Sequence, residues 1–503
     1  MSLKKNVIAN YFGAGWTALM TFAFVPFYIR YLGIEAYGLI GIYTMLQAWL
    51  SLLDLGMTPA MSRELAGLGD DRRKGQQARD LLRSVEVIFF CLATAVALAV
   101  WASSRWLAST WLSSKGVAPD VLAQAFAIMG VVVGLRLIEN IYRSSIVGMQ
   151  RQVALSAVTS VVATFRGFGA VIVLAFVAPT IQAYFLWQCL VSVLSVSALA
   201  ATAYRALPPA LARAGFSLPA LRSVWRFAAG TMAITFLSLL LTQIDKVLLS
   251  RLLTLEAFGY YAFAVVVAQL PIALVAPVTQ AFFPRFAQLL KQDNQAGLAL
   301  AYHTACQLIT VLLGSATVLL LLSGQEILRA WTGDIDLSAR TYPLVVVIAL
   351  GSLLNGLMTV PYFLQLSSGW TALNIRVNLV AIALVVPALF WVVPRHGAIG
   401  AAWIWVGLNA TYVFVVIPLM HRRLLVGEKW RWYARDVGLP LVAAAAVALL
   451  LGAVIPEQHG RVAMLVKTAF CFAAIAAAAT FAAPIVRAQF FAHLPAGLKP
   501  RAR

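Results

Sequence analysis

Charged side chains are scarce in this chain of 503 residues. Only 11% of the residues are Asp, Glu, Lys or Arg, whereas a soluble globular protein carries about 25%. Hydrophobic residues make up 62% of the chain, in recurrent runs long enough to cross a bilayer as helices. The composition excludes an ordinary soluble enzyme. It predicts an all-α membrane protein, because open sheets leave backbone groups unpaired in lipid.

Patterns for metals, disulfides and cofactors are also missing. The four cysteines lie singly within apolar runs, with no CxxC pair, so they are expected to act as small packing residues. The five histidines are scattered and show no HExxH spacing. The sequence therefore predicts no metal site and no cofactor.

Hydropathy predicts about 14 transmembrane helices. The first follows Lys4 and Lys5 and is longer than the apolar core of a signal peptide, about 7–15 residues, so it is expected to stay uncleaved. The predicted spans are 7–29, 36–57, 85–102, 121–141, 153–177, 181–203, 227–249, 258–283, 305–322, 343–364, 372–393, 398–420, 437–455 and 462–483.

The formal net charge of +20 follows the predicted topology. The two termini and the connections on their side hold 26 of the 38 Lys and Arg residues, and the opposite side holds eight. By the positive-inside rule, both termini lie in the cytoplasm. Most of the basic excess is therefore topological, and we expect no nucleic-acid partner.

One charged stretch occurs twice, 221 residues apart. "IRYLGIEAYG" covers 29–38 and "SRLLTLEAFG" covers 250–259, and we name these stretches the first and second corner. Six predicted spans separate them, so the two halves share one orientation, as in transporters built from parallel repeats. We expect the corner to set the first hairpin of each half, its glycine permitting a tight turn; direct contact with substrate is the alternative. The matched residues are Arg30 and Arg251, Glu35 and Glu256, and Gly38 and Gly259.

The repeat predicts the domain organisation. The N-terminal lobe covers 1–204, a cytoplasmic linker 205–226 and the C-terminal lobe 227–420, followed at 421–503 by a basic loop, two further spans and a cytoplasmic tail. The longest predicted outer loops lie around 105–120 and 324–341 and are short. A membrane enzyme that joins glycans would want a larger outer loop, so the chain is predicted not to be an enzyme.

Charges within predicted spans are candidates for function, because a charge at mid-bilayer costs about 2.5–3.5 kcal/mol. Arg166 lies deepest, and it is expected either to face a cavity or to pair with a carboxylate such as Glu139. Arg136, Glu139 and Arg143 are spaced by three and four, so they share one helix face. They are expected to neutralise one another or to line a water-filled cavity.

Two aspartates could carry a coupling proton or cation. Asp245 and Lys246 are adjacent, so they are expected to point to different sides of their helix and not to neutralise each other on one face. Asp54 lies near the inner end of its predicted span, where pairing with Arg63 or Arg83 is the favoured interpretation and a coupling role is the alternative.

The motifs "YLGIEAYGL", "LLDLGM" and "SREL" resemble those of polysaccharide transporters in the multidrug/oligosaccharidyl-lipid/polysaccharide flippase superfamily, especially bacterial O-antigen flippases of the Wzx type. The resemblance covers almost the whole chain. It implies a MATE-like flippase fold with two pseudo-symmetric six-helix lobes and two C-terminal helices. It also implies that an oligosaccharide linked to undecaprenyl diphosphate is moved between leaflets of the bacterial inner membrane.

The resemblance also suggests roles for the charged residues. A diphosphate crossing a low-dielectric region needs basic partners, and arginine suits phosphate oxygens. The residues predicted to make or rim a cationic cavity are Arg166, Arg136, Lys246, Arg30 and Arg63. Asp245 and Asp54 are the coupling candidates, for H⁺ or another ion.

Membrane lipids and polysaccharide assembly proteins are further expected partners. The alternatives are a lipid II flippase, a multidrug or cation exporter and, less favoured, a membrane glycan polymerase or ligase. An exporter of cations would want an anionic cavity, whereas the charges within the predicted spans are mostly basic.

Overall fold

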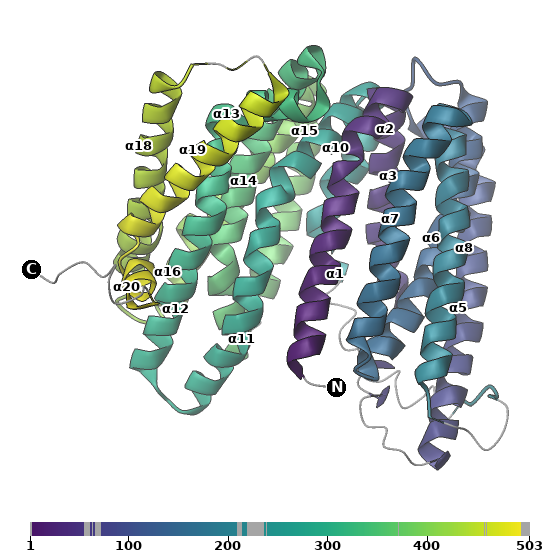
Figure 1. Ribbon diagram of the computed structural model, residues 1–503, viewed down its shortest axis with the longest axis horizontal. Helices are drawn as coiled ribbons and strands as arrows, with labels where there is room; N and C mark the ends of the chain where they lie inside the picture. The colour runs from purple at the N-terminus through teal and green to yellow at the C-terminus, as the bar shows by residue number, and fades with distance from the viewer. Residues whose placement is uncertain are drawn as a thin grey trace, which may run out of the picture. The chain divides into compact units, whose positions relative to one another are not determined.

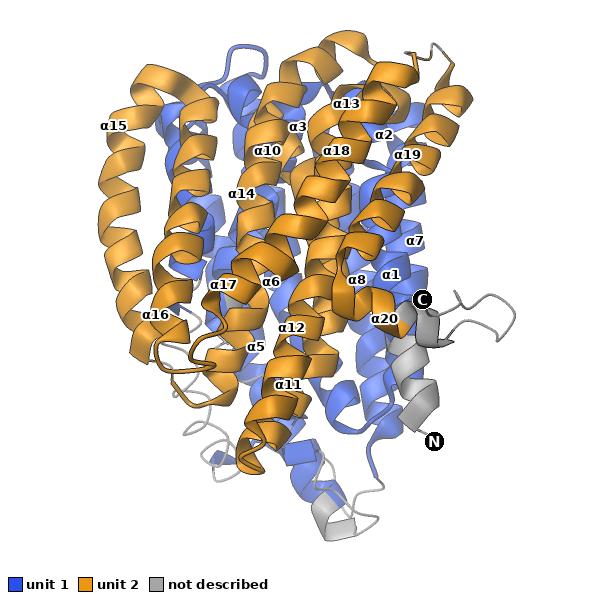
Figure 2. Cartoon of the chain, turned by 90° about the vertical axis from the view of Figure 1, so that its left-hand side faces the viewer, with its two compact units in different colours: residues 1–259 blue, residues 260–503 orange. Residues whose placement is uncertain are grey.

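The computed structural model describes residues 3–54, 61–62, 64–65, 72–208, 214–218, 236–237, 239–370, 372–456, 458 and 460–493. These residues are mainly helical, as predicted, and among them the one isolated β-bridge joins Ser113 and Thr254. Two compact units make up the chain, Met1–Gly259 and Tyr260–Arg503, coloured separately in Figure 2.

Unit 1 is built on long helices that run alongside one another (Figure 1). Within it α6 packs on both α5 and α8, while α7 packs on α1 and α8. Residues 239–252 are helical and also belong to this unit. The labelled helices are α1 (Leu3–Ala23), α2 (Val25–Leu32), α3 (Ile34–Leu50), η1 (Ser51–Asp54), α5 (Arg72–Trp106), η2 (Leu107–Trp111), α6 (Pro119–Gly148), α7 (Gln152–Phe176) and α8 (Ile181–Ala206).

Unit 2 follows from α10 (Leu255–Gln269), which begins at the end of unit 1. Its helix α14 packs on α11, α12, α13 and α15, and α13 also packs on α18 and α19. The remaining helices are η3 (Leu270–Leu274), α11 (Val275–Lys291), α12 (Gln295–Ile309), η4 (Thr310–Gly314), α13 (Ser315–Thr332), α14 (Ile335–Ser367), α15 (Ala372–Thr411), η5 (Tyr412–Val416), α16 (Ile417–His421), α17 (Lys429–Arg431), η6 (Trp432–Gly438), α18 (Leu439–Val454), α19 (Arg461–Ala482) and α20 (Pro484–His493).

Eleven helices in the described residues are long and apolar enough to cross a membrane. One of them, residues 372–421, contains two predicted spans, and its helix α15 is kinked at Gly397, where φ is +60°. The predicted span 36–57 corresponds to α3, which has 17 residues, and to a following segment whose last residues lie outside the described chain. The predicted span 227–249 is described only from residue 236 onward.

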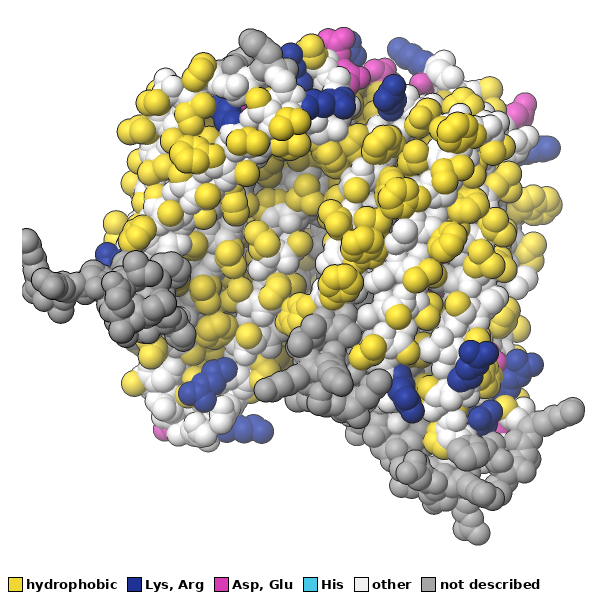
Figure 3. Space-filling model, in the orientation of Figure 1, with side chains coloured by type: hydrophobic (Ala, Val, Ile, Leu, Met, Phe, Trp, Pro, Cys, Tyr) yellow, Lys and Arg dark blue, Asp and Glu magenta, His cyan; other side chains and the backbone are white. Residues whose placement is uncertain are grey.

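The surface fits a bilayer. On the face shown in Figure 3, hydrophobic side chains cover the middle of each unit, while Lys and Arg lie mostly near its two ends. Large apolar side chains such as Phe165, Phe176 and Trp391 are more than half exposed. Exposed apolar surface on this scale marks contact with lipid or with another protein.

Unit 2 contains a buried polar network that the scattered histidines of the sequence did not predict. His303 of α12 hydrogen-bonds Asp436 of η6 through Nδ1 and Glu428 through Nε2, the latter at 3.0 Å. Gln307 Nε2 donates to Asp436 Oδ1 at 2.8 Å, and its Oε1 accepts from the backbone N–H of Ile485 at 2.9 Å. The network therefore joins α12 to the segment around η6 and to α20.

Removing the imidazole should destabilise unit 2. In the variant His303→Ala, the fully buried Asp436 loses one of its two partners, and breaking a buried pair of this kind costs about 3 kcal/mol. We expect a clearly lower thermal midpoint for the purified protein in detergent. The matched control His396→Ala changes an exposed histidine and should leave the midpoint in place; equal midpoints for both variants would show that the network does not stabilise the fold.

Candidate functional site

A single buried carboxylate in unit 1 is surrounded by guanidinium groups. Glu139 of α6 is 1% exposed, and its Oε2 lies 3.0 Å from Arg136 Nη1 and 3.8 Å from Arg143 Nη2. These three residues share one face of α6, as their spacing predicted. The partial neutralisation expected within this stripe is therefore present.

A second helix adds a third guanidinium to the same carboxylate. Arg166 of α7 approaches Glu139 Oε1 to 3.7 Å, and its Nη1 donates to Gln188 Oε1 of α8 at 2.8 Å. Both of its terminal nitrogens lie 3.4 Å from Ser192 Oγ, one turn further along α8. Of the two expectations for Arg166, pairing with Glu139 is the one that these contacts bear out.

The charges in this cluster do not balance. Three guanidinium groups and one carboxylate leave a formal charge of +2, and the Arg166 side chain is only 16% exposed. Arg136 Nε is buried and has no hydrogen-bond partner among the described residues. Uncompensated charge in a low-dielectric region is costly, so the cluster is suited to an anionic group that supplies the missing charge. We name Arg136, Glu139, Arg143 and Arg166 the arginine cluster.

The other predicted cations do not contact Glu139 in the part of the chain that the structure describes. Lys246 Nζ pairs with Asp245 Oδ1 at 3.4 Å and donates to the backbone carbonyl of Thr242 at 2.8 Å. The expectation that Asp245 and Lys246 would not neutralise each other is therefore wrong, because the long lysine side chain bends back around its helix. Arg30, in the last turn of α2, is exposed.

Two predicted residues fall outside the description. Arg63 is not among the described residues, and the side chain of Asp54, the last residue of η1, is not described. Their predicted roles remain predictions.

The two corners hold the end of η2 and the connection that follows it. Glu35 accepts hydrogen bonds from Ser114 Oγ at 2.8 Å and from the backbone N–H of Lys115 and Gly116 at 2.9 and 3.0 Å. Arg251 donates to the backbone carbonyls of Thr110 and Trp111, the latter at 3.2 Å. One residue from each corner, at non-equivalent positions of the repeat, thus fixes neighbouring parts of residues 110–116. Glu256, in the first turn of α10, is exposed.

The two corners also pack on each other reciprocally. A Cβ at Gly38 would lie 2.7 Å from the carbonyl oxygen of Leu255, and a Cβ at Gly259 would lie 2.1 Å from that of Ile34. Because Leu255 is the repeat equivalent of Ile34, the contact has the form of a two-fold interface. Gly38 and Gly259 lie within helices α3 and α10, so the prediction that they permit a tight turn is wrong. They permit a close helix crossing instead.

Comparison with known proteins identifies the family. The model of the family described as "Polysaccharide biosynthesis protein" matches residues 3–290, more than half of the chain. The chain belongs to this polysaccharide biosynthesis protein family. A curated relative from Shigella flexneri, named "Putative O-antigen transporter", is 21% identical over 419 residues, which cover 80% of this chain and 94% of the relative. The resemblance stated from the motifs is confirmed.

Solved structures with the same fold are transporters by name. This polysaccharide biosynthesis protein matches the lipid II flippase MurJ in an inward closed conformation with a TM-score of 0.69 at 12% identity, over 97% of this chain and 98% of that one. A MATE-family multidrug transporter in an inward-facing conformation matches with a TM-score of 0.62 at 12% identity, over 81% and 94%. At such identities the likeness establishes the fold alone, and the expected MATE-like helical fold is confirmed.

The arginine cluster predicts a specific stability effect in this polysaccharide biosynthesis protein. Glu139→Gln raises the formal charge of the cluster from +2 to +3 and removes the carboxylate that all three arginines contact. We expect a loss of about 3 kcal/mol, measured as a lower thermal midpoint in detergent. The control Glu256→Gln changes an exposed carboxylate and should leave the midpoint unchanged. If both variants melt like wild type, Glu139 does not hold the cluster together.

Proposed function

We propose that this protein is a flippase that moves an oligosaccharide linked to undecaprenyl diphosphate from the cytoplasmic to the periplasmic leaflet by alternating access. The observation that carries the proposal is the arginine cluster, a site with a buried carboxylate, partly buried guanidinium groups and a formal charge of +2 in a chain otherwise poor in charge. The family match and the O-antigen relative favour a polysaccharide repeat unit as the cargo.

The chemistry of the cargo fits the cluster. A diphosphate carries negative charges that lose their hydration in a low-dielectric region, and planar guanidinium groups replace water with charge-assisted hydrogen bonds. When the diphosphate enters, it would take up the excess positive charge that Glu139 leaves uncompensated. No bond is made or broken in this process, so the proposed protein is a transporter and not an enzyme.

The proposed function also carries an arrangement of the helices and roles for the remaining charged residues. We infer about 14 transmembrane helices, with two six-helix lobes at 1–204 and 227–420 and two further helices, in the bacterial inner membrane with both termini cytoplasmic. Arg30, Lys246 and Arg63 would rim the path of the diphosphate. Asp245 and Asp54 would be the coupling carboxylates, and protonation of Asp245 would release Lys246 from its ion pair.

The crossing of the two corners offers a place for the required movement. In the proposed architecture the second corner belongs to the C-terminal lobe, on the periplasmic side. Alternating access would then require the reciprocal contact of Gly38 and Gly259 to separate and to form again in each cycle. The hydrogen bonds of Arg251 to the end of η2 and of Glu35 to the connection after it would guide the return of this contact.

A lipid II flippase is the second candidate, because the MurJ structure shares the fold over nearly the whole chain. That cargo would use the same arginine cluster. Complementation separates the two: an O-antigen flippase restores surface glycan, whereas a lipid II flippase restores growth when the host's own lipid II flippase is depleted. A cation exporter is less favoured, since the arginine cluster has the opposite charge to the one that a cation needs.

The principal test is the charge of Arg166. In a strain that lacks its own O-antigen flippase, Arg166→Ala should reduce surface glycan at least tenfold, and Arg166→Lys should restore part of it, because both effects follow from a buried positive charge. Protein levels are measured in parallel, and Arg395→Ala, an exposed arginine of α15, serves as the control. Normal surface glycan with Arg166→Ala would exclude Arg166 as part of the anion site.

The corner crossing gives a second test. Gly259→Leu places a side chain against the backbone of Ile34, so the two corners can no longer close. We expect surface glycan to fall at least tenfold at normal protein level, and the reciprocal variant Gly38→Leu to behave alike. Gly452→Leu is the control, because nothing lies within 4 Å of a Cβ at that position in the structure. Full activity of Gly259→Leu would mean that the crossing takes no part in transport.

A further inference from the structure

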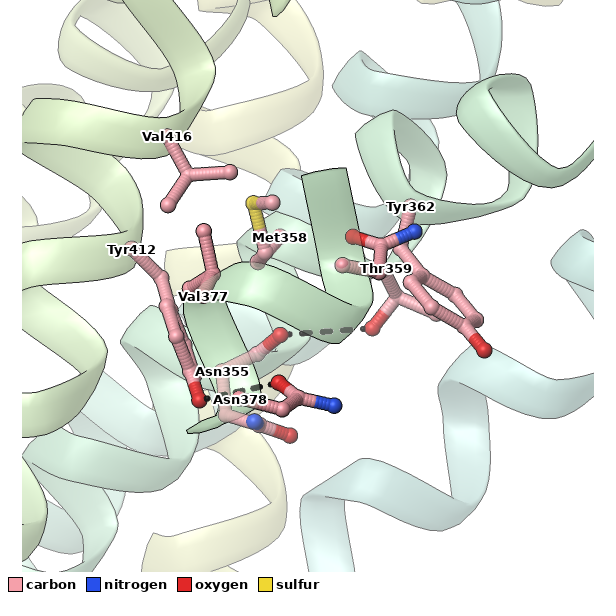
Figure 4. Close-up of a pocket in the computed structure, with 9 residues that line it drawn as sticks. Asn355, Met358, Thr359, Tyr362, Val377, Asn378, Tyr412 and Val416 are labelled. Atoms are coloured by element: carbon pink, nitrogen blue, oxygen red, sulfur yellow. Dashed lines mark hydrogen bonds between the residues drawn. The ribbon is translucent and has the colours of Figure 1, made fainter. Parts of the chain in front are cut away.

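Unit 2 contains a pocket of about 190 Å³ lined by α14, by the part of α15 before its kink at Gly397, and by η5 (Figure 4). Its lining residues come from three short sequence stretches, and none of these stretches by itself predicts a pocket. The lining residues are Asn355, Met358, Thr359, Tyr362, Asn374, Val377, Asn378, Tyr412 and Val416. We name this cavity the amide pocket.

The polar residues of the amide pocket form two facing stripes. Asn355, Thr359 and Tyr362 are spaced by four and three on α14, so they lie on one face of that helix. Asn374 and Asn378 are spaced by four on α15. Polar groups are costly in a membrane-spanning bundle, and their convergence on a single cavity indicates a polar ligand or water within it.

Part of the hydrogen-bonding capacity is used by the protein itself. Asn355 Nδ2 donates to Asn409 Oδ1 at 2.9 Å, and Tyr412 Oη donates to Asn378 Oδ1 at 3.5 Å. Figure 4 shows Tyr412 and Asn378 joined in this way. Among the described residues, Asn355 Oδ1 and Asn378 Nδ2 have no protein partner, which leaves one amide oxygen to accept from a ligand and one amide NH2 group to donate to it.

Interhelical bonding alone does not explain the amide pocket. Amide side chains often join helices in membranes, and the pair of Asn355 and Asn409 does so here. Asn374 and the hydroxyl of Tyr362 line the cavity yet make no side-chain hydrogen bond within the described chain. These groups are available to a ligand.

We propose that the amide pocket binds one sugar ring of the lipid-linked glycan, an assignment that rests on the proposed function. No Lys, Arg, Asp or Glu lines the pocket, so it suits neither a phosphate nor a cation. Amides both donate and accept hydrogen bonds, as the hydroxyl groups of a sugar require. The rings of Tyr362 and Tyr412 and the apolar Met358 and Val377 suit the C–H face of a sugar ring.

The volume agrees with a single ring. Pockets for drug-sized ligands measure about 300–1,000 Å³, so a cavity of about 190 Å³ is too small for a whole repeat unit. The amide pocket would therefore select one sugar of the glycan, while the arginine cluster binds the diphosphate without regard to the sugar.

The test measures binding by the purified full-length protein in lipid nanodiscs. The probes are undecaprenyl diphosphate alone and the same lipid carrying glucose, galactose or N-acetylglucosamine. The wild type should bind at least one sugar-bearing probe about tenfold more tightly than the bare lipid, as expected for two or so neutral hydrogen bonds. The double variant Asn374→Ala/Asn378→Ala should lose this difference and retain the affinity for the bare lipid.

A structural control distinguishes ligand binding from helix packing. Asn409→Ala removes the bond to Asn355 but does not line the pocket, so it should lower the thermal midpoint more than it lowers sugar preference. The single variant Asn374→Gln serves if the double variant does not fold, and it should also lose most of the preference.

The possible failures are distinguishable. If the wild type binds the bare lipid but prefers none of the three sugars, the amide pocket is not a sugar site. The same conclusion follows if the preference survives Asn374→Ala/Asn378→Ala. If the wild type does not bind undecaprenyl diphosphate at all, the proposed function itself fails.

Discussion

The shared carboxylate of Glu139 is the interaction on which unit 1 depends. Three arginines from two helices converge on it, and it is nearly inaccessible to solvent. One carboxylate cannot balance three guanidinium groups, so the cluster keeps a partly buried excess of positive charge around a single buried negative charge. In the proposed function, such an arrangement would keep the arginines oriented before cargo arrives, and the anionic cargo would then complete the neutralisation. The family and the fold are consistent with this use.

The same principle, polar groups satisfied by distant parts of the chain, recurs in the rest of the molecule. Arg251 of the second corner holds the end of η2, and Glu35 of the first corner holds the connection that follows it. The network around His303 ties α12 to segments more than a hundred residues away. The amide pocket in unit 2 is lined by amide, hydroxyl and apolar side chains and by no Lys, Arg, Asp or Glu. The arginine cluster and the amide pocket are thus chemically distinct. In the proposed function, binding of the diphosphate and selection of the sugar would be separate tasks.

The sequence was sufficient for features that depend on local composition. Hydropathy located the eleven long apolar helices of the described residues because a bilayer demands long apolar runs, and spacing placed Arg136, Glu139 and Arg143 on one face. Prediction from the sequence failed where the contacts depend on the reach of a long side chain or on a partner far away in the chain. Lys246 reaches back to Asp245 against the expectation from adjacency, and Gly259 meets Ile34 across more than two hundred residues. The His303 network and the amide pocket were missed because their residues come from distant segments, and no short sequence pattern shows that these segments meet.

The most direct measurement compares three lipids that differ only in head-group charge. Undecaprenol, undecaprenyl monophosphate and undecaprenyl diphosphate are titrated into nanodiscs holding the wild type or Arg166→Ala. If the arginine cluster receives the diphosphate, wild-type affinity rises with each phosphate, and Arg166→Ala loses at least tenfold for the diphosphate because a charged hydrogen bond contributes about 1.5–3 kcal/mol. Equal affinity for all three lipids in the wild type, or an unchanged series in Arg166→Ala, would contradict this assignment.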